Sequence, residues 1–328
     1  MASYKGNLLN HFKIVKKWAD RAGADAILDV SSFRLLIRRN DQQAVLYPQF
    51  MNVEDRRRQY SPELTDASRR FIGWLPYSVR RWAIASDKIE FKRYAERAGM
   101  RTPEYCLDDD PAIRDVIVKR RSSSFSVGIR GPFRHAGEAP LDASQSEYYE
   151  RFIDGRIGKI WFYENFPICM EIERMPSVTG DGMLSARDLI QVKLRAKGAT
   201  GFDMERAETL RRFCGDSLER VPARDETVVV DFRYGSALAV REPGQNINLK
   251  KAMPEVWSDE LRAIGEACWR GIPAEIQEGT IYTVDVVVDP EERIWALEMN
   301  SNPFVHPFLY GHLLSNLVKR DAAERVRH

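Results

Sequence analysis

The sequence predicts an α+β or mixed-sheet protein, and two observations support that class. Strand-like runs follow one another directly, 157–164 before 168–174 and 281–288 before 294–299, as the two arms of a hairpin do. The predicted helices do not alternate strictly with these strands, which disfavours a doubly wound parallel sheet. The length of 328 residues gives room for about two domains at roughly 150 residues each.

The composition argues against several classes of protein. Hydrophobic residues make up 44% of the chain, yet no run approaches the roughly 18 apolar residues of a membrane-spanning helix. Lysine and arginine (50) nearly balance aspartate and glutamate (48), so the bulk charge indicates neither a nucleic-acid nor a membrane partner. The N-terminus has no apolar signal region, and the four cysteines are too widely spaced for a disulfide or metal framework. We therefore expect a soluble cytoplasmic protein, and a homodimer remains open.

Residues 1–85 predict a small N-terminal α/β domain. An amphipathic helix is expected over 11–22, because apolar residues recur there at helical spacing. Short strands are expected after it, over 26–30, 33–37 and 44–47.

Residues 86–155 predict a second unit that begins with a helix. Asp87, with Glu90 three positions later, has the pattern of a helix N-cap, and Gly99 ends the helix. The elements expected after it are a strand over 116–119, a helix over 144–149 and a turn over 152–155.

Residues 156–328 predict a larger α/β lobe. Helices are expected over 185–196 and 258–269. Strands are expected over 157–164, 168–174, 228–231, 236–240, 281–288 and 294–299. The sequence Asp-Pro-Glu-Glu at 289–292 is typical of a turn between the last two strands.

Asp285, Glu298 and Asn300 form the strongest candidate site. On paired strands, side-chain alternation puts Glu298 and Asn300 on one face, and the hairpin can bring Asp285 beside them. Two carboxylates and an amide carbonyl among apolar neighbours suit a hard divalent cation, for which Mg²⁺ beside nucleotide phosphates is the natural choice. The alternative is an ordinary amphipathic hairpin whose polar residues face solvent.

Lys119 and the loop after it are a candidate phosphate site. The loop over 122–131 is rich in small hydroxylated residues, so a ligand can approach its backbone N–H groups, and Lys119 adds a positive charge. The alternative is a solvated lysine followed by a serine-rich surface loop. The chain has neither a P-loop nor a G-x-G-x-x-G motif, which disfavours the common nucleotide-binding folds.

Taken in order, these segments resemble the ATP-grasp superfamily over roughly residues 86–315. The segments are Asp87-Lys88 at the start of a helix, 99–103, Lys119 with its loop, 150–155, and Asp285 followed by Glu298-x-Asn300. The resemblance implies two α/β lobes that hold ATP between them, a small lid lobe (86–155) and a large catalytic lobe (156–328), after a pre-ATP-grasp domain (1–85). It also implies an ADP-forming ligase that joins a carboxylic acid to an amine through an acyl phosphate.

The resemblance assigns roles to individual residues. The residues that it assigns to ATP are Lys88, Lys119, Ser123, Ser124, Ser126, Glu150, Arg151, Phe152 and Asp154. The lysines would contact the nucleotide, with Lys119 also catalytic. The serines would lie in a lid loop over the phosphates, and 150–152 would form a hinge that binds adenine, largely through backbone groups. Asp285, Glu298 and Asn300 would bind one or two Mg²⁺ ions.

A narrower resemblance, to ligases related to cyanophycin synthetase, is carried by 173–182 and by Arg241 in the stretch 241–249. Those enzymes couple amino acids or peptides, so the resemblance implies substrates of that kind. Arg241 would stabilise the negative charge that develops at the acyl phosphate. The candidate substrate residues are Asn246, Asn248, Asn302 and His306. The histidine would orient or deprotonate the amine, unless it is a buried structural residue.

The sequence also departs from the ATP-grasp pattern. Arg151 stands where the hinge usually has an acid or a small polar residue, Gly158 lies near the expected ribose carboxylate, and Thr283 replaces a frequent arginine. Asp154 is the substitute candidate for the ribose contact. Two other functions stay open, an ATP-grasp phosphotransferase and a nucleotide-binding regulatory protein without turnover. The expected partners of the ligase are a small-molecule or peptide carboxylate and an amine.

Overall fold

The computed structural model describes residues 3–54, 57–108, 113–123, 126–199, 201–239 and 244–318. Its strands form four sheets, and every strand pairing within these ranges is antiparallel. The predicted α+β class is therefore confirmed, and the described ranges contain no mixed sheet. None of the helices in these ranges has the length and apolarity needed to cross a membrane.

The first sheet lies in the N-terminal part of the chain. Its strands are β1 (Asp25–Leu28), β2 (Leu35–Arg39), β3 (Gln42–Glu54), β4 (Arg57–Ser61) and β5 (Ser68–Leu75). They have the order β1-β2-β3-β4, with β5 also paired to β3. Helix α1 (Ser3–Ala22) packs against β1 and β5, so the predicted helix is confirmed and begins earlier than expected.

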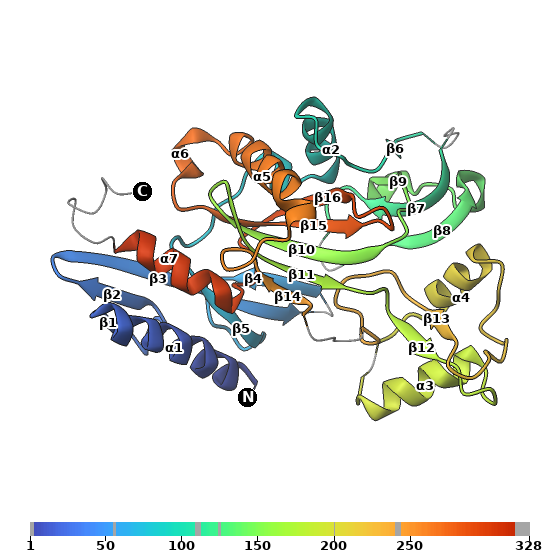
Figure 1. The fold of residues 1–328 in the computed structure, drawn as a ribbon, viewed down its shortest axis with the longest axis horizontal. Coiled ribbons are helices and arrows are strands. Elements are labelled where there is room, and N and C mark those ends of the chain that lie inside the picture. Colours follow the sequence, from blue (N-terminus) through green and yellow to red (C-terminus); the bar gives the residue numbers. More distant parts are fainter. Residues whose placement is uncertain are drawn as a thin grey trace.

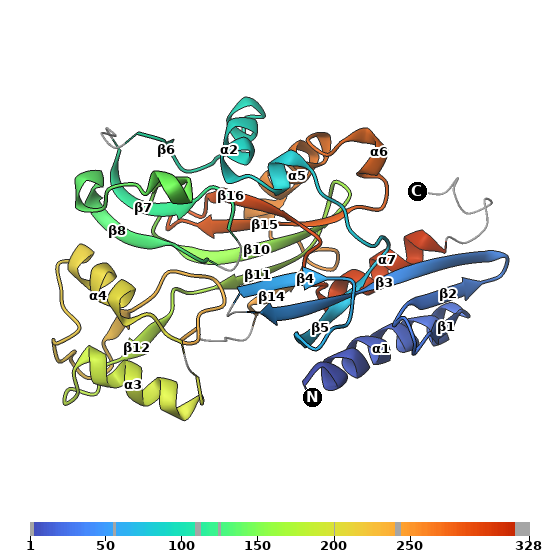
Figure 2. The same ribbon diagram turned by 180° about the vertical axis from the view of Figure 1, so that it is seen from behind.

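The last described helix completes the core of this N-terminal sheet. Helix α7 (Pro307–Leu317) lies beside α1 in both views (Figures 1 and 2). The Tyr310 hydroxyl accepts a hydrogen bond from the Trp74 backbone N–H at 3.1 Å and contacts Nδ1 of His11 at 2.8 Å. Tyr310, Trp74 and Phe71 are fully buried together, so the two ends of the described chain share one hydrophobic core.

The second sheet is small and has the order β6-β9-β7-β8. Its strands are β6 (Tyr105–Cys106), β7 (Arg114–Arg120), β8 (Arg130–His135) and β9 (Glu147–Arg151), and the single 3₁₀ turns near it are Ala136–Glu138 and Ala143–Gln145. The helix expected over 144–149 is wrong. The segment pairs with β7 from Arg120↔Glu147 to Val116↔Arg151, and these sheet hydrogen bonds override the local helical preference of the sequence.

Helix α2 (Lys88–Arg97) follows a 3₁₀ turn at Ala83–Ala85 and begins at the predicted cap. The Asp87 side chain accepts hydrogen bonds from the backbone N–H groups of Ile89 and Glu90, at 2.9 and 3.2 Å. Phe91 and Ala95 are buried in the core of the central sheet described next. The first turn of α2 therefore holds Lys88 at the edge of that sheet, while the boundaries at 85 and 155 stay predictions.

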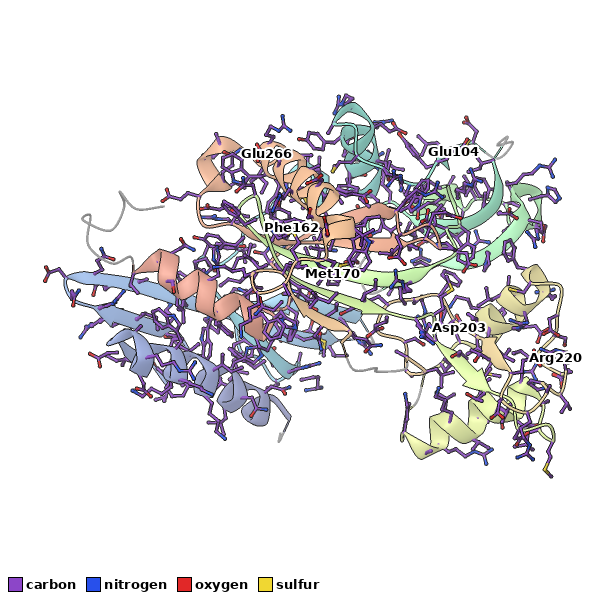
Figure 3. All side chains as sticks on the ribbon, in the orientation of Figure 1. Glu104, Phe162, Met170, Asp203, Arg220 and Glu266 are labelled. Carbon is purple, nitrogen blue, oxygen red and sulfur yellow. The ribbon has the colours of Figure 1, made fainter. Side chains whose placement is uncertain are left out.

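The central sheet has the order β14-β11-β10-β15-β16. Its strands are β10 (Arg156–Tyr163), β11 (Phe166–Glu173), β14 (Asn246–Asn248), β15 (Ile281–Val288) and β16 (Ile294–Ser301), so both predicted hairpins are confirmed. Helix α5 (Glu255–Arg270) covers one face, with the short α6 (Ala274–Gln277) after it. Phe162 and Met170 are buried beneath α5, near Glu266 in Figure 3.

A small unit with its own core is inserted between β11 and β14. It contains β12 (Ser177–Thr179), α3 (Ala186–Ala196), α4 (Met204–Phe213) and β13 (Thr227–Val229). Figure 3 labels Asp203 and Arg220 in this unit, at the end of the molecule away from α1. The sequence predicted α3 but not α4. The strand expected over 236–240 is absent from its described part, 236–239, where the Ser236 hydroxyl donates to Asp231 and shapes a turn.

Candidate active site

A narrow cleft with a volume of about 90 Å³ lies between the small sheet and the central sheet. Its lining comes from β7 and β9 on one side and from β10, β15, β16 and 232–234 on the other. The predicted site residues that line it are Lys88, Lys119, Ser123, Ser126, Glu150, Arg151, Phe152, Asp285 and Glu298. The fold thus brings most of the nucleotide candidates and two of the metal candidates into one place.

Five polar side chains, one from each strand, form a row across the central sheet. In strand order, this polar row consists of Asn246, Glu171, Lys159, Asp285 and Glu298, each opposite the next in the strand register. Residues that stand opposite one another point to the same face of a sheet. The alternate residues, such as Ile160 and Val284, are buried on the α5 side. The polar row therefore lies on the face turned away from α5.

Two lysines hold the carboxylates at one end of the polar row. Lys88 Nζ lies 3.0 Å from Glu298 Oε2, and Lys159 Nζ pairs with Asp285 Oδ1. Burial opposes ionisation of Glu298, but the ammonium groups of Lys88 and Lys119 outweigh it and hold its pKa at about 2. Burial raises the pKa of Asp285 against the pull of Lys159, and the Glu298 charge adds to that rise. The Asp285 and Glu298 carboxylates therefore lie next to each other, and nearby cations offset the repulsion between them.

Glu150 is buried between two further lysines. Its Oε1 lies 2.7 Å from Lys119 Nζ, and its Oε2 lies 2.7 Å from Lys92 Nζ. Burial favours the neutral acid, but the two ammonium groups lower the pKa of Glu150 by more than burial raises it. Burial likewise disfavours the Lys119 cation, and Glu150 and Glu298 together raise its pKa in spite of that. Lys119 is therefore held as a cation at the wall of the cleft.

The loop after β7 carries the predicted lid serines. Ser123 and Ser126 both line the cleft, whereas Ser124 lies outside the described residues. The Ser123 carbonyl accepts a hydrogen bond from Lys88 Nζ at 2.6 Å. Lys88 therefore connects this loop to Glu298 across the cleft.

The predicted hinge lines the cleft, but two of its backbone donors are already used. The Arg151 N–H donates to the Glu104 carbonyl at 2.8 Å, and the Phe152 N–H donates to the Asp115 carbonyl at 2.6 Å. In this arrangement, an adenine contact at the hinge has to use other groups. Asp154 is exposed and is not among the residues that line the cleft, so the structure does not bring the ribose candidate to the site.

Two of the predicted amides carry buried polar atoms without a hydrogen bond. Asn300, opposite Thr283, lies beside the Asp285 end of the polar row, and its Nδ2 has no partner in the described structure. Asn248 lies opposite Cys169, and its buried Oδ1 also has no partner there. Asn246 is the exposed end of the polar row. The two buried amide atoms are available to a ligand.

The remaining substrate candidates differ in their surroundings. His306 Nδ1 accepts a hydrogen bond from the Phe308 N–H at 3.2 Å, and its Nε2 lies 3.4 Å from Glu171 Oε1. The Asn302 amide is hydrogen-bonded to the Arg80 backbone: its Nδ2 donates to the Arg80 carbonyl at 2.6 Å, and its Oδ1 accepts from the Arg80 N–H at 2.9 Å. Asn302 therefore supports a loop in this structure rather than the cleft. Arg241 lies outside the described residues.

Several residues of the site carry no signal in the sequence analysis. These are Lys92, Lys159, Glu171 and Tyr234. A single charged residue in a strand is usually solvent-facing. The signal that could have found Lys159 is register, because pairing the two hairpins places it opposite Asp285.

The donor set at the Asp285 end of the polar row suits magnesium. Asp285, Glu298 and Asn300 offer oxygen atoms on one face, and the two carboxylates are balanced here by lysine cations. The described ranges contain no group of three His, Cys, Asp or Glu side chains that could hold a metal. Mg²⁺ fits such a partial set, since it is usually bound by one or two carboxylates and completes its shell with water and substrate phosphates.

Comparison with known proteins gives matches to solved structures only. No protein-family model matches the chain, and no curated protein matches it. A bifunctional glutathione synthetase from Pasteurella multocida is similar over 90% of this chain and 41% of its own, with 14% identity and a TM-score of 0.41. A D-alanine-D-alanine ligase from Bacillus anthracis is similar over 71% of this chain and 66% of its own, with 14% identity and a TM-score of 0.41. The ATP-grasp ligase PsnB, complexed with minimal precursor, is similar over 71% of this chain and 60% of its own, with 13% identity and a TM-score of 0.34. This chain spans less than two thirds of each, and similarity at this level defines no activity.

Proposed function

We propose that the chain is an ATP-dependent, ADP-forming ligase that joins a carboxylate to an amine. The observation that supports it is the convergence of Asp285 and Glu298 with Lys88, Lys119 and Lys159 around one cleft. A nucleoside triphosphate is highly anionic, and lysines beside carboxylates that can hold a metal are the combination that binds and neutralises it.

The residues on the two sides of the cleft take different parts in this proposal. Lys88 and Lys119 bind the phosphates, and each is already held by a carboxylate, so their positions are fixed before the nucleotide arrives. The loop with Ser123 and Ser126 covers the phosphates. Asp285, Glu298 and Asn300 hold one or two Mg²⁺ ions, which supply charge neutralisation at the β- and γ-phosphates when bound.

The chemistry follows from the low reactivity of a carboxylate toward amines. Transfer of the γ-phosphoryl group to the carboxylate releases ADP and gives an acyl phosphate with a good leaving group. The neutral amine then attacks the acyl carbon, the C–O bond to phosphate breaks, and the proton lost by the nitrogen leaves with the inorganic phosphate. The lysines stabilise the charge on the transferring group, and closure of the cleft excludes water from the acyl phosphate. Arg241, which the motif resemblance assigns to this step, adds a positive charge, and the same resemblance favours amino acids or peptides as substrates.

Product analysis tests this function. ADP release is screened with amino acids, dipeptides and simple carboxylic acids, and hydroxylamine is then supplied in place of the amine. We expect ADP, inorganic phosphate and an acyl hydroxamate. AMP with pyrophosphate would contradict the proposal. A stable phosphorylated product without hydroxamate would favour the phosphotransferase, and ATP binding without turnover across the panel would favour a regulatory protein.

A further inference from the structure

Glu171 lies on β11, two strands from Asp285 along the polar row. The other two carboxylates of the row each have a lysine partner. No lysine or arginine of the described ranges lies within ion-pair distance of Glu171, whose side chain is 23% exposed. Lys159, which lies opposite Glu171 in the strand register, pairs with Asp285 instead, although its charge still lowers the pKa of Glu171. The Glu171 carboxylate is therefore partly accessible and has no direct ion pair with a lysine or arginine of the described ranges.

The two groups that contact Glu171 hold it as a carboxylate. Tyr234 donates its hydroxyl to Oε2, and His306 Nε2 approaches Oε1 at 3.4 Å. Burial raises the pKa of Glu171, but the hydrogen bonds from His306 and Tyr234 lower it by more. A carboxylate has about four acceptor positions, and these two contacts use two of them. Glu171 thus keeps acceptor capacity for a ligand.

The hydrogen bonds of His306 fix its role. Its Nδ1 accepts the Phe308 N–H that begins α7, so this nitrogen carries no proton. A neutral imidazole then carries its proton on Nε2, and this N–H faces Glu171. His306 is therefore a donor that orients Glu171, and the expectation that it deprotonates the amine is not supported by this arrangement.

Glu171 lies near the cleft, two strands from the end of the polar row where the phosphates are proposed to bind. Glu171 is not itself a lining residue of the cleft, but Tyr234 is, and the Tyr234 hydroxyl contacts the Glu171 carboxylate. Two strand spacings separate Glu171 from Asp285, about 10 Å. A phosphoryl group held near Asp285, the acyl carbon joined to it through an oxygen atom and a nitrogen about 3 Å from that carbon fit within this separation and leave room for contact between the nitrogen and Glu171.

We propose that Glu171 binds the ammonium group of the amine substrate, so that the site selects a primary amine that is cationic at neutral pH. The identity of the bound amine as a substrate rests on the proposed ligase function, but binding of an ammonium group at Glu171 can be measured without turnover. Tyr234 and His306 are positioning residues, because both act on the substrate through Glu171.

Calorimetry with two small probes tests this ammonium site. Alaninamide carries an ammonium group and no carboxylate, and lactamide has a hydroxyl in its place. We expect the wild-type protein to bind alaninamide at least tenfold more tightly than lactamide, and Glu171→Gln to lose that difference. Glu171→Asp keeps the charge and should restore part of it. Equal affinities in the wild-type protein, or an unchanged preference in Glu171→Gln, would overturn the proposal.

A control variant and a second reaction separate this inference from the proposed function. Glu266→Gln removes a carboxylate that is hydrogen-bonded by Asn165 on the α5 side of the sheet, and it should keep the wild-type preference. Hydroxylamine is uncharged at neutral pH, so Glu171→Gln should still form hydroxamate while the KM for the amine rises at least tenfold. Hydroxamate formation with an unchanged KM contradicts the ammonium site alone. If Glu171→Gln loses the preference for alaninamide but the wild-type protein makes no hydroxamate, the result contradicts the ligase function and not the ammonium site.

Discussion

Lys119 Nζ lies 2.7 Å from Oε1 of Glu150, and both side chains are almost completely buried. The opposite oxygen of Glu150 faces Lys92, so one carboxylate balances two cations beneath the wall of the cleft. An ion pair of this kind is weak evidence for stability as a whole, but removal of the shared partner leaves uncompensated charge.

Glu150→Gln should therefore be strongly destabilising. Two buried ammonium groups then lose their shared charge partner, and we expect a loss of about 3–5 kcal/mol in the free energy of unfolding, measured by urea denaturation. Glu90→Gln is the surface control, since its side chain is 37% exposed and its partner Arg93 is 49% exposed, and it should cost about 1 kcal/mol or less. Adding Lys92→Met to Glu150→Gln should restore part of the loss. Equal costs for the two glutamate variants would contradict the shared-charge account.

Asp285→Asn and Glu298→Gln should abolish turnover while the fold persists. Each removes an anionic oxygen donor for Mg²⁺, and we expect the rate to fall by roughly two orders of magnitude or more. Calorimetry should show that ATP binding to the wild-type protein requires Mg²⁺ and that either variant weakens this dependence. Glu291→Gln, 63% exposed in the turn between β15 and β16, is the control. Wild-type activity in either site variant would rule out the metal assignment.

Lys119→Ala should weaken ATP binding, because the cation at the cleft wall is lost. In the wild-type protein, peptides that include Ser123 and Ser126 should gain protection from hydrogen exchange when ATP and Mg²⁺ are added. Mass spectrometry measures both states, and α3, in the separate inserted unit, serves as the internal reference. The same exchange with and without nucleotide would count against a lid role for this loop.

Stability should fall as the pH drops below about 6.5, partly through His11. Burial lowers the pKa of His11 to about 4, with Arg70 adding to the effect, whereas an unfolded histidine titrates near 6.5. The fold favours the neutral ring, so its stabilisation is complete above pH 6.5 and is lost toward pH 4. Between pH 8 and 5.5 the loss from this residue is about 1.4 kcal/mol.

Urea denaturation at several pH values, compared with His11→Asn, measures that contribution. The variant should show a shallower dependence over this range. Part of the dependence should remain, because burial and Lys250 lower the pKa of His312 to about 4 as well. Parallel curves for the variant and the wild-type protein would show that His11 does not titrate as described.

The hairpins could be predicted from the sequence, and with them one end of the polar row. Period-two alternation and the turn at 289–292 were enough to place Asp285 beside Glu298. Lys159 and Glu171 were not found, because a charged residue in a single strand is indistinguishable from a solvent-facing one. Their place in the site depends on long-range strand pairing, which puts Lys159 of β10 opposite Glu171 of β11 on one side and Asp285 of β15 on the other.

The errors in the local predictions have the same physical origin. The segment at 147–151 has residues compatible with a helix, but pairing with β7 decides its conformation. Helix α4 was missed although Asp203 accepts a hydrogen bond from the Arg206 N–H, a cap that the sequence does signal. Asn302 was assigned to substrate by its position after the metal motif, whereas the backbone of Arg80, far away in the chain, engages its amide.

The hydrogen bond between His11 and Tyr310 joins residues 299 positions apart, which sets a condition on synthesis of the protein. At roughly 5–20 residues per second, a ribosome needs about 15–60 s to travel that distance. During this interval the apolar face of the first sheet is finished but still waits for α7 to cover it. The apolar face of the N-terminal strands should therefore stay exposed until α7 has been synthesised.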